Sequence, residues 1–287
     1  EPPAIEEPPM PQPSMAEPPS SEGSPGEEPP AKEVPPSENS EISPVETREI
    51  IKEVEEFSTA PVGFGPGITT DENNRPLSAL SYQKKYADHG LTALTYDEGI
   101  IYLTFDQGYE NGYTAPILDT LREKSVTATF FVTLSYAKKN PDLIRRMIEE
   151  GHVIGNHSNT HPSMPKITVE ECVEEVMSVH EYMRDSYDYE MNLFRPPSGE
   201  FSVATLEILK ILGYENVFWS FAYVDWETDN QPDPAAAFER ITKSTHDGAI
   251  YLLHSVSSTN ALILGDVIDD WNAGGYAVMA YGKEPRP

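Results

Sequence analysis

The sequence has 287 residues and a formal net charge of −28, because 48 acidic side chains stand against 20 lysines and arginines; a nucleic-acid partner is therefore not expected, since phosphate binding needs a basic surface. No apolar run approaches the roughly 20 residues that cross a bilayer, so we expect no membrane insertion of this chain. The single cysteine, Cys172, excludes an internal disulfide and a cysteine-rich zinc scaffold.

The composition of the chain changes near residue 57. Residues 1–56 hold 14 of the 27 prolines and no aromatic residue, so they cannot bury enough apolar surface to offset their conformational entropy. We predict a disordered Pro/Glu-rich spacer over residues 1–57, either a tether or a tail without a specific role, with a short amphipathic helix around residues 45–57 as the alternative for its last part. The chain starts at Glu1 without an initiator methionine, and we expect an upstream segment to have been removed.

Residues 58–99 are expected to form an irregular lead-in to a catalytic domain over residues 100–283. In that domain, short apolar runs alternate with amphipathic segments of helical period. The expected strands cover residues 100–105, 126–132, 153–155, 192–194, 217–221, 249–253 and 276–280. The expected helices cover residues 114–124, 141–150, a segment that begins at the capping box of Thr168 and Glu171, and residues 202–212, 234–244 and 259–272.

This alternation implies parallel strands joined by right-handed crossovers. We therefore predict an α/β fold. About seven repeats favour a closed or nearly closed (β/α) barrel, with a doubly wound sheet as the alternative.

Polar residues that can do chemistry follow five of the expected strands. In parallel α/β folds the carboxyl ends of the strands meet on one face, where ligands bind. Each residue alone has a structural explanation, but their joint placement predicts one site. The residues are Asp106, His157, His161, Arg195, Asp225 and His254.

Two of these residues have the spacing of metal ligands. His157 and His161 can present two imidazoles to one cation if their turn is helical, although two unrelated loop histidines are commoner. Asp106, beside a cation, can accept a proton from water as a general base. The alternative for Asp106 is a cap on the next helix.

His254 also ends an apolar strand. An imidazole there can act as a general acid because it titrates near neutral pH, whereas a core histidine bonded to a backbone carbonyl is the structural alternative. Asp225 can hold His254 in one tautomer and raise its pKa, or it can pair with Arg195.

The segment from Arg195 to Gly199, Arg-Pro-Pro-Ser-Gly, is a stiff loop whose prolines lack N–H groups. The backbone N–H groups of Ser198 and Gly199 are therefore the donors available to an oxyanion, with a rigid turn and a surface arginine as the alternative. Aromatic residues near strand ends can stack on a sugar ring or belong to the core: Tyr223, Trp226 and Trp219.

Five motifs occur in a characteristic order. They are Thr104-Phe105-Asp106-Gln107-Gly108, His157-Ser158-Asn159-Thr160-His161, the Arg195 loop, Val224-Asp225-Trp226 and Leu252-Leu253-His254. Over roughly residues 61–281 the chain thus resembles the polysaccharide deacetylase (NodB-homology) domain of carbohydrate esterase family 4. The longer strings around Gly108 and His254 are similar to the branch of δ-lactam-biosynthetic de-N-acetylases, which acts on N-acetylmuramic acid of peptidoglycan.

The resemblance implies a deformed (β/α)7–8 barrel that hydrolyses N-acetyl groups with metal-activated water. Carried over residue by residue, it implies Asp106 as the base, oriented by Arg195. It implies His254 as the acid that protonates the leaving amine, tuned by Asp225.

The resemblance also implies the surroundings of these groups. His157 and His161 would bind one divalent metal ion, which is zinc, magnesium or manganese. This ion and the N–H of Ser198 would hold the oxyanion. Leu252 and Trp226 would line the pocket for the acetyl methyl group.

Two positions depart from the family pattern. Gln107 stands where most members have an aspartate metal ligand, so a neutral amide oxygen would replace a charged ligand and hold cations less tightly. Ala222 stands where an aspartate usually occurs three residues before Asp225, which leaves open how the Asp225 loop is braced.

We therefore expect a metal-dependent hydrolase of linear amide bonds that removes N-acetyl groups from peptidoglycan, with N-acetylmuramic acid as the sugar. A deacetylase of chitin-like or other acetylated glycans is one alternative. A non-catalytic glycan-binding domain is another, which Gln107 favours and which Asp106 and His254 oppose. The expected partner is the peptidoglycan glycan strand, and the chain is expected to be a secreted or extracytoplasmic monomer, tethered through the spacer to a membrane or cell wall.

Overall fold

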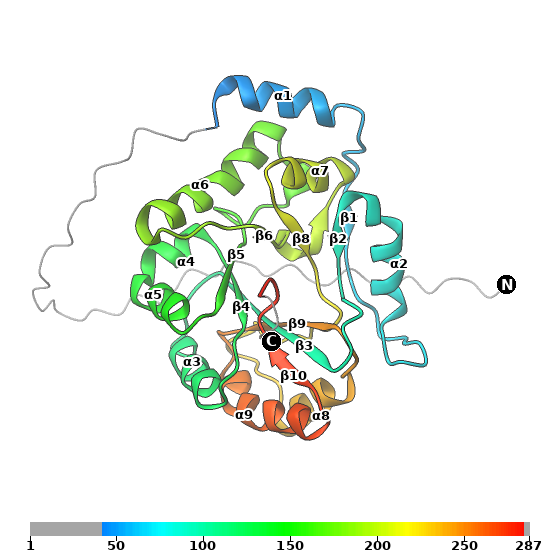
Figure 1. Ribbon diagram of the computed structural model, residues 1–287, viewed down its shortest axis with the longest axis vertical. Helices are drawn as coiled ribbons and strands as arrows, with labels where there is room; N and C mark the ends of the chain where they lie inside the picture. Colours follow the sequence, from blue (N-terminus) through cyan, green and yellow to red (C-terminus); the bar gives the residue numbers. More distant parts are fainter. Residues whose placement is uncertain (1–41, 284–287) are drawn as a thin grey trace, which may run out of the picture. The chain divides into compact units, whose positions relative to one another are not determined.

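The sheet at the centre of the fold is built around β3 (Ile100–Gln107), which is buried along almost its whole length. The computed structural model describes residues 42–283, so the part of the predicted spacer before residue 42 lies outside the described residues. Parallel ladders join β3 to β4 (Thr129–Val132), β9 (Ala249–His254) and β10 (Ala277–Met279) (Figure 1).

From β3 the sheet curls round through β4 and the following strands until its far end approaches β9. The strand order is β10-β3-β4-β5-β6-β8-β2, with β9 also paired to β3. Single bridges from Phe221 to Tyr251 and from Leu94 to Ala249 connect the far end of this path to β9. This incomplete closure confirms the predicted deformed barrel. The other strands are β5 (Val153–Asn156), β6 (Leu193–Phe194), β8 (Glu215–Val217) and β2 (Leu91–Thr92), and a separate antiparallel pair joins β1 (Val62–Gly63) to β7 (Glu200–Phe201).

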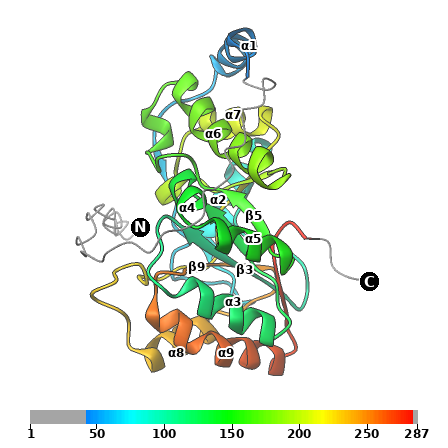
Figure 2. The same cartoon turned by 90° about the vertical axis from the view of Figure 1, so that its left-hand side faces the viewer.

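Helices pack around the sheet, and α3, α8 and α9 lie side by side at one end in both views (Figures 1 and 2). The helices predicted after residue 100 are present, those with two predicted ends within one residue of them, whereas α2 and α4 were not predicted. The helices are α2 (Leu77–Lys85), α3 (Thr114–Glu123), α4 (Leu134–Lys139), α5 (Pro141–Glu149), α6 (Val169–Tyr187), α7 (Val203–Ile211), α8 (Pro234–Lys243) and α9 (Ser258–Ala273).

The start of α6 is set by the predicted capping box. The Thr168 side chain accepts the backbone N–H of Glu171, and the Glu171 side chain accepts that of Thr168, which satisfies two donors that the helix leaves free. The predicted apolar stripe faces the core, where Cys172, Val176 and Met183 are buried.

The folded unit begins earlier than residue 58. Helix α1 (Pro44–Val54) starts at a capping box of Ser43 and Glu46, and Ile50 and Val54 are buried in the main core. Residues 42–57 are therefore not a spacer, because the amphipathic alternative forms and buries its apolar face.

The lead-in over residues 58–99 is also more regular than expected. Strand β2 extends the main sheet by pairing with β8, and Phe64, Tyr86 and Leu91 belong to a second core cluster. The two-residue strands β1 and β2 are too short to give a periodic pattern, so the sequence does not reveal them.

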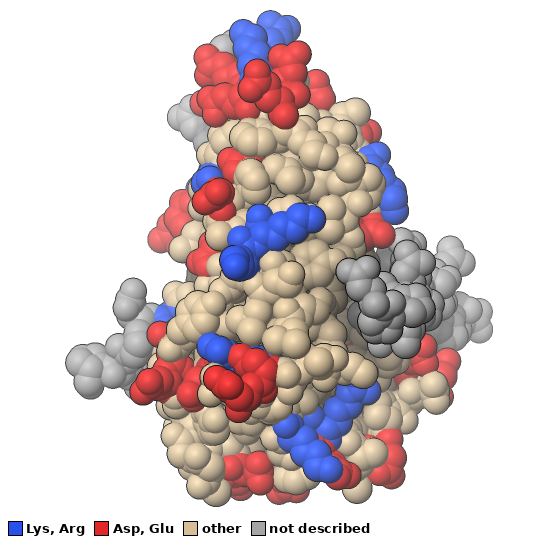
Figure 3. Space-filling model, turned by 90° about the vertical axis from the view of Figure 1, so that its right-hand side faces the viewer, with Lys and Arg blue, Asp and Glu red and all other residues tan. Residues whose placement is uncertain are grey.

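Acidic side chains gather at two ends of the face shown in Figure 3. One group lies over α1, where Glu46, Glu49 and Glu53 are exposed, and another lies at the opposite end.

Among residues 42–283, no helix combines the length and apolar character needed to cross a bilayer.

Candidate active site

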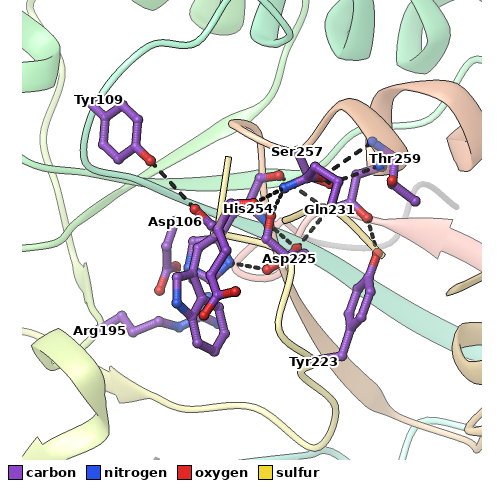
Figure 4. Close-up of polar contacts among 12 residues, drawn as sticks. Asp106, Tyr109, Arg195, Tyr223, Asp225, Gln231, His254, Ser257 and Thr259 are labelled. Carbon is purple, nitrogen blue, oxygen red and sulfur yellow. Dashed lines mark hydrogen bonds and ion pairs between the residues drawn. The ribbon is translucent and has the colours of Figure 1, made fainter. Parts of the chain in front are cut away.

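Asp106 and His254 lie at the carboxyl ends of two adjacent strands. The parallel register of β3 and β9 pairs the Cα atoms of these two residues. Arg195 follows β6, and Asp225 lies in the loop after Phe221. The structure thus brings together the strand ends that the sequence singled out, as Figure 4 shows.

Arg195 is completely buried and is not the surface arginine of the alternative interpretation. Its Nη1 donates to Asp106 Oδ1 over 2.7 Å and to Thr104 Oγ1 over 2.8 Å. Its Nε and Nη2 donate to the carbonyls of Val217 and Phe218, each over 3.1 Å. These four bonds fix the guanidinium, which in turn orients the Asp106 carboxylate.

An aromatic ring supports this guanidinium. The Cζ atom of Arg195 lies 4.1 Å from the centroid of the Phe131 ring. Gly155 leaves room for that ring, because a Cβ at this position would lie 2.4 Å from Phe131 Cδ1. The sequence interpretation missed both residues, since neither Phe131 nor Gly155 carries a signal beyond its place in an expected strand.

The charge of Asp106 follows from these neighbours. Burial alone would raise the pKa of its carboxyl. The Arg195 guanidinium, together with His157 and His254, outweighs burial and brings the pKa below the usual aspartate value. Asp106 is therefore ionised at neutral pH and can accept a proton.

An irregular loop brings His157 and His161 together, with ring centroids 4.9 Å apart. The turn is not the helical one that the i, i+4 spacing suggested, because Ser158 and His161 have φ of 68° and 61°. The Ser158 hydroxyl accepts the N–H of His161 over 2.9 Å and closes this turn. Such backbone strain in non-glycine residues persists only where the surroundings impose it.

The orientation of His157 leaves one ring nitrogen free. Its Nδ1 donates to the Arg195 carbonyl over 2.8 Å, so Nε2 of the neutral ring carries the lone pair, 3.6 Å from Asp106 Oδ2. Burial lowers the pKa of both histidines, that of His161 to about 4. Both imidazoles are thus neutral at pH 7 and able to bind a cation.

The remaining donors near these histidines fit a divalent cation only weakly. Gln107 Nε2 donates to Ser255 Oγ, and Gln107 Oε1 is buried without a hydrogen-bond partner in the described part of the chain. Between residues 42 and 283 no group of three or more His, Cys, Asp or Glu side chains is arranged to hold a metal ion. His157 and His161 therefore offer two neutral imidazole donors, and the unpaired Oε1 of Gln107 is a candidate third donor.

His254 is paired with Asp225 in the manner predicted, and Asp225 does not pair with Arg195. The Asp225 carboxylate accepts His254 Nδ1–H over 2.7 Å and the backbone N–H of His254 over 2.8 Å. Burial lowers the pKa of the imidazole, but Asp225, aided by Asp106, outweighs burial and raises the pKa above the usual histidine value. His254 can therefore carry a proton near neutral pH.

The loop around Asp225 is braced without the aspartate that Ala222 replaces. Gln231 Nε2 donates to the carbonyls of Asp225 and Glu227, each over 2.9 Å. Gln231 Oε1 accepts the Ser257 hydroxyl at the start of α9. No local sequence pattern points to Gln231, because its role depends on contacts with residues far away in the chain.

Of the predicted substrate-binding positions, Leu252 and Trp226 lie beside His254, and Ser198 and Gly199 follow Arg195 in the chain. The N–H of Gly199 is bonded to the Pro196 carbonyl, so Ser198, at φ 55°, is the remaining candidate oxyanion donor. Leu252 shares a strand face with His254, and the Trp226 ring lies 5.5 Å from the His254 ring. Tyr109, which the sequence interpretation missed, is 52% exposed beside the Trp226 carbonyl (Figure 4).

Tyr223 and Trp219 belong to the core, one of the two alternatives for the aromatic residues near strand ends, so the prediction that Tyr223 contacts substrate was wrong. Tyr223 is 5% exposed, and its hydroxyl donates to Asn260 behind the Asp225 loop. Trp219 is 3% exposed and packs edge-on against Phe64. Neither buried ring can stack on a sugar. Strand-end position alone does not distinguish the inner from the outer side of a curled sheet, so the sequence could not separate these rings from site residues.

Comparison with known proteins bears on this arrangement. The polysaccharide deacetylase family matches residues 93–217. A peptidoglycan-N-acetylmuramic acid deacetylase, PdaA of Bacillus subtilis (strain 168), is 49% identical over 195 residues, which cover 66% of this chain and 74% of that protein.

Solved structures agree with the sequence match. The structure of Bacillus subtilis PdaA, described as a family 4 carbohydrate esterase, aligns with a TM-score of 0.73 and 40% identity over 78% of this chain and 96% of that one. A family 4 carbohydrate esterase from Bacillus anthracis aligns with a TM-score of 0.65 and 39% identity over 78% and 95%. The chain belongs to the polysaccharide deacetylase family, carbohydrate esterase family 4.

Proposed function

We propose that this protein is a peptidoglycan deacetylase that hydrolyses the N-acetyl group of N-acetylmuramic acid residues. The opposed pair of Asp106 and His254 supports this most, because an ionised carboxylate stands in register with a protonatable imidazole. Amide hydrolysis needs such a base and such an acid beside one C–N bond. The relative that carries this activity in its name supports the choice of sugar.

In the proposed reaction, Asp106 accepts a proton from water while the water oxygen bonds to the acetyl carbon. The backbone N–H of Ser198 stabilises the oxyanion that forms. The C–N bond then breaks, and His254 donates its proton to the sugar nitrogen, so that a free amine and acetate leave. Arg195 keeps Asp106 ionised and oriented, and Asp225 keeps His254 protonated and oriented.

His157 and His161, with Gln107 Oε1, would hold a divalent cation, and their imidazoles suit zinc or manganese better than magnesium, which prefers oxygen ligands. Such a cation, when bound, would polarise the acetamide carbonyl and make a nearby water more acidic. Leu252 and the Trp226 ring would enclose the acetyl methyl group.

The catalytic domain would comprise residues 42–283. Because its substrate is peptidoglycan, the enzyme would act outside the cytoplasm.

Release of acetate from purified peptidoglycan tests this proposal. We expect muropeptides to lose the mass of one acetyl unit at muramic acid, as read by fragment mass spectrometry, and we expect Asp106→Asn and His254→Gln to abolish the loss. Asp269→Asn, an exposed aspartate on α9, is the matched control and should retain full activity. Deacetylation of chitooligosaccharides alone would replace the proposed substrate, and retention of activity by Asp106→Asn would exclude the proposed base.

A further inference from the structure

Asn260, in the first turn of α9, connects three parts of the site. It is 1% exposed, and its amide Nδ2 donates to Asp225 Oδ2 over 2.6 Å and to the His254 carbonyl over 3.1 Å. Its Oδ1 accepts the hydroxyl of Tyr223. Every polar atom of the amide is therefore used between Asp225, His254 and Tyr223.

Only one orientation of this amide satisfies its neighbours. A carboxylate and a carbonyl can only accept hydrogen bonds, so the NH2 group must face Asp225 and His254. The Tyr223 hydroxyl, placed on the other side, then donates to Oδ1. The backbone N–H of Asn260 is held by the Ser257 hydroxyl over 3.0 Å, which fixes the turn that carries the side chain.

The Asn260 amide completes the set of hydrogen-bond donors around the buried Asp225 carboxylate. Asp225 is 0% exposed, and its Oδ2 accepts from both the backbone N–H of His254 and Asn260 Nδ2. Asp225 Oδ1 accepts from His254 Nδ1. Removal of the Asn260 donor would leave Oδ2 with one bond, so that only the two donors of His254 would still hold the carboxylate.

We propose that Asn260 is a positioning residue, held in turn by Tyr223, which fixes the Asp225 carboxylate against His254 and so keeps His254 Nε2 available to the leaving amine. This inference rests on the proposed deacetylation, in which His254 is the acid. The charged groups that face His254 are Asp225 from its loop, Asp106 from β3 and Arg195 after β6.

A set of variants at residue 260 separates hydrogen bonding from packing. Asn260→Asp preserves the shape of the side chain but turns an acceptor toward Asp225, whereas Asn260→Leu removes all polar atoms. If the donor matters, Asn260→Asp should lose about 10- to 100-fold in kcat at pH 8, which corresponds to one hydrogen bond to a charged group, with KM changed less than about twofold. Its activity relative to the unchanged enzyme should rise as pH falls, because the introduced carboxyl regains a donor when it is protonated.

Thr259→Val is the matched control. Thr259 lies in the same buried turn and donates to the Pro232 carbonyl over 2.8 Å, on the other side of the loop. This variant should retain kcat even if it is less stable. Tyr223→Phe, which releases only Oδ1 of Asn260, should lower kcat by a few-fold.

A measurement on the resting protein keeps the inference independent of turnover. In 15N-histidine spectra of the unchanged protein, the neutral His254 ring should carry its proton on Nδ1, and Asn260→Leu should move the two ring nitrogen signals toward each other. Wild-type kcat in Asn260→Asp, or unchanged ring signals in Asn260→Leu, would overturn the inference. An unchanged enzyme that deacetylates no glycan would instead remove the proposed function, and the spectra would still decide the positioning role.

Discussion

Arg195 and Asp106 form an ion pair that is almost completely shielded from water, with Nη1 2.7 Å from Oδ1 and side-chain exposures of 0% and 8%. The other donors of the guanidinium are bonded to backbone carbonyls of the strand-end segment and to Thr104. The backbone thus positions the arginine, and the arginine positions the base. A buried pair of this kind costs free energy to desolvate, and it is tolerated here because four of the five guanidinium N–H donors are hydrogen-bonded.

Arg195→Lys should therefore impair both stability and catalysis. An ammonium group cannot reproduce the fork of donors, so the buried carbonyls of Val217 and Phe218 lose their hydrogen-bond donors. We expect the free energy of unfolding to fall by about 3 to 5 kcal/mol and kcat to fall by at least about 100-fold. Urea unfolding at pH 7 and acetate release measure the two effects, and a lysine variant with unchanged stability would contradict the account of this pair.

Gly155→Ala should disturb the same base from a greater distance. The added Cβ would overlap the Phe131 ring at 2.4 Å, so the ring must move from beneath the Arg195 guanidinium. Overpacking of this kind costs about 1 to 3 kcal/mol, and we expect kcat to fall with it. Gly265→Ala, within helix α9, is the control, because its Cβ would meet Lys124 at an ordinary 3.5 Å. Alanine in a helix should stabilise the protein by about 0.5 to 1 kcal/mol relative to glycine. Equal effects of the two substitutions would exclude the packing argument.

The sequence was sufficient to locate the proposed acid, the proposed base and their partners, because each follows a buried strand and parallel strand ends converge. Asp106, Arg195, Asp225 and His254 were found this way, the capping box placed the start of α6, and α9 was predicted to within one residue at each end. These features are local in the chain, so a single sequence contains them.

The residues that orient these groups could not be found in the same way. Phe131, Gly155, Gln231 and Asn260 act through contacts with residues far away in the chain, and none stands in a distinctive local pattern. Tyr223 was assigned to the wrong side of the sheet for a related reason. The curl of a barrel decides which side of a strand end faces the cleft, and that curl is a property of the closed sheet.

Gln107 provides a test of the cation site. Its neutral Oε1 lacks a hydrogen-bond partner, and Gln107→Asp would add a charge where the donor set has two neutral imidazoles. We expect zinc to bind at least about 10-fold more tightly to this variant in calorimetric titration of chelator-treated protein. Gln107→Asn shortens the side chain equally without the charge and should show no gain. If both variants bind zinc as the unchanged protein does, Gln107 is not a ligand.

His152 should make the stability of the fold depend on pH away from the catalytic groups. Burial lowers its pKa to about 4, and its Nδ1 accepts the backbone N–H of Ala128 over 3.1 Å, a bond that the protonated ring cannot make. Because the unfolded chain takes up this proton near pH 6.5 and the folded chain near pH 4, the stabilisation is complete above pH 6.5 and is lost as pH falls toward 4. The loss from this group is about 3 kcal/mol.

His152→Gln isolates this contribution, because the amide oxygen can still accept from Ala128 but does not titrate. The difference in unfolding free energy between the unchanged protein and this variant should shift by about 3 kcal/mol against the unchanged protein between pH 7 and pH 4. Contributions of titrating groups that do not interact with His152 cancel in that difference, whereas that of Glu150, whose Oε2 lies 3.7 Å from His152 Nε2, does not. Urea unfolding at several pH values measures it, and a difference that stays constant over this range would show that His152 takes up its proton equally in the folded and unfolded chains.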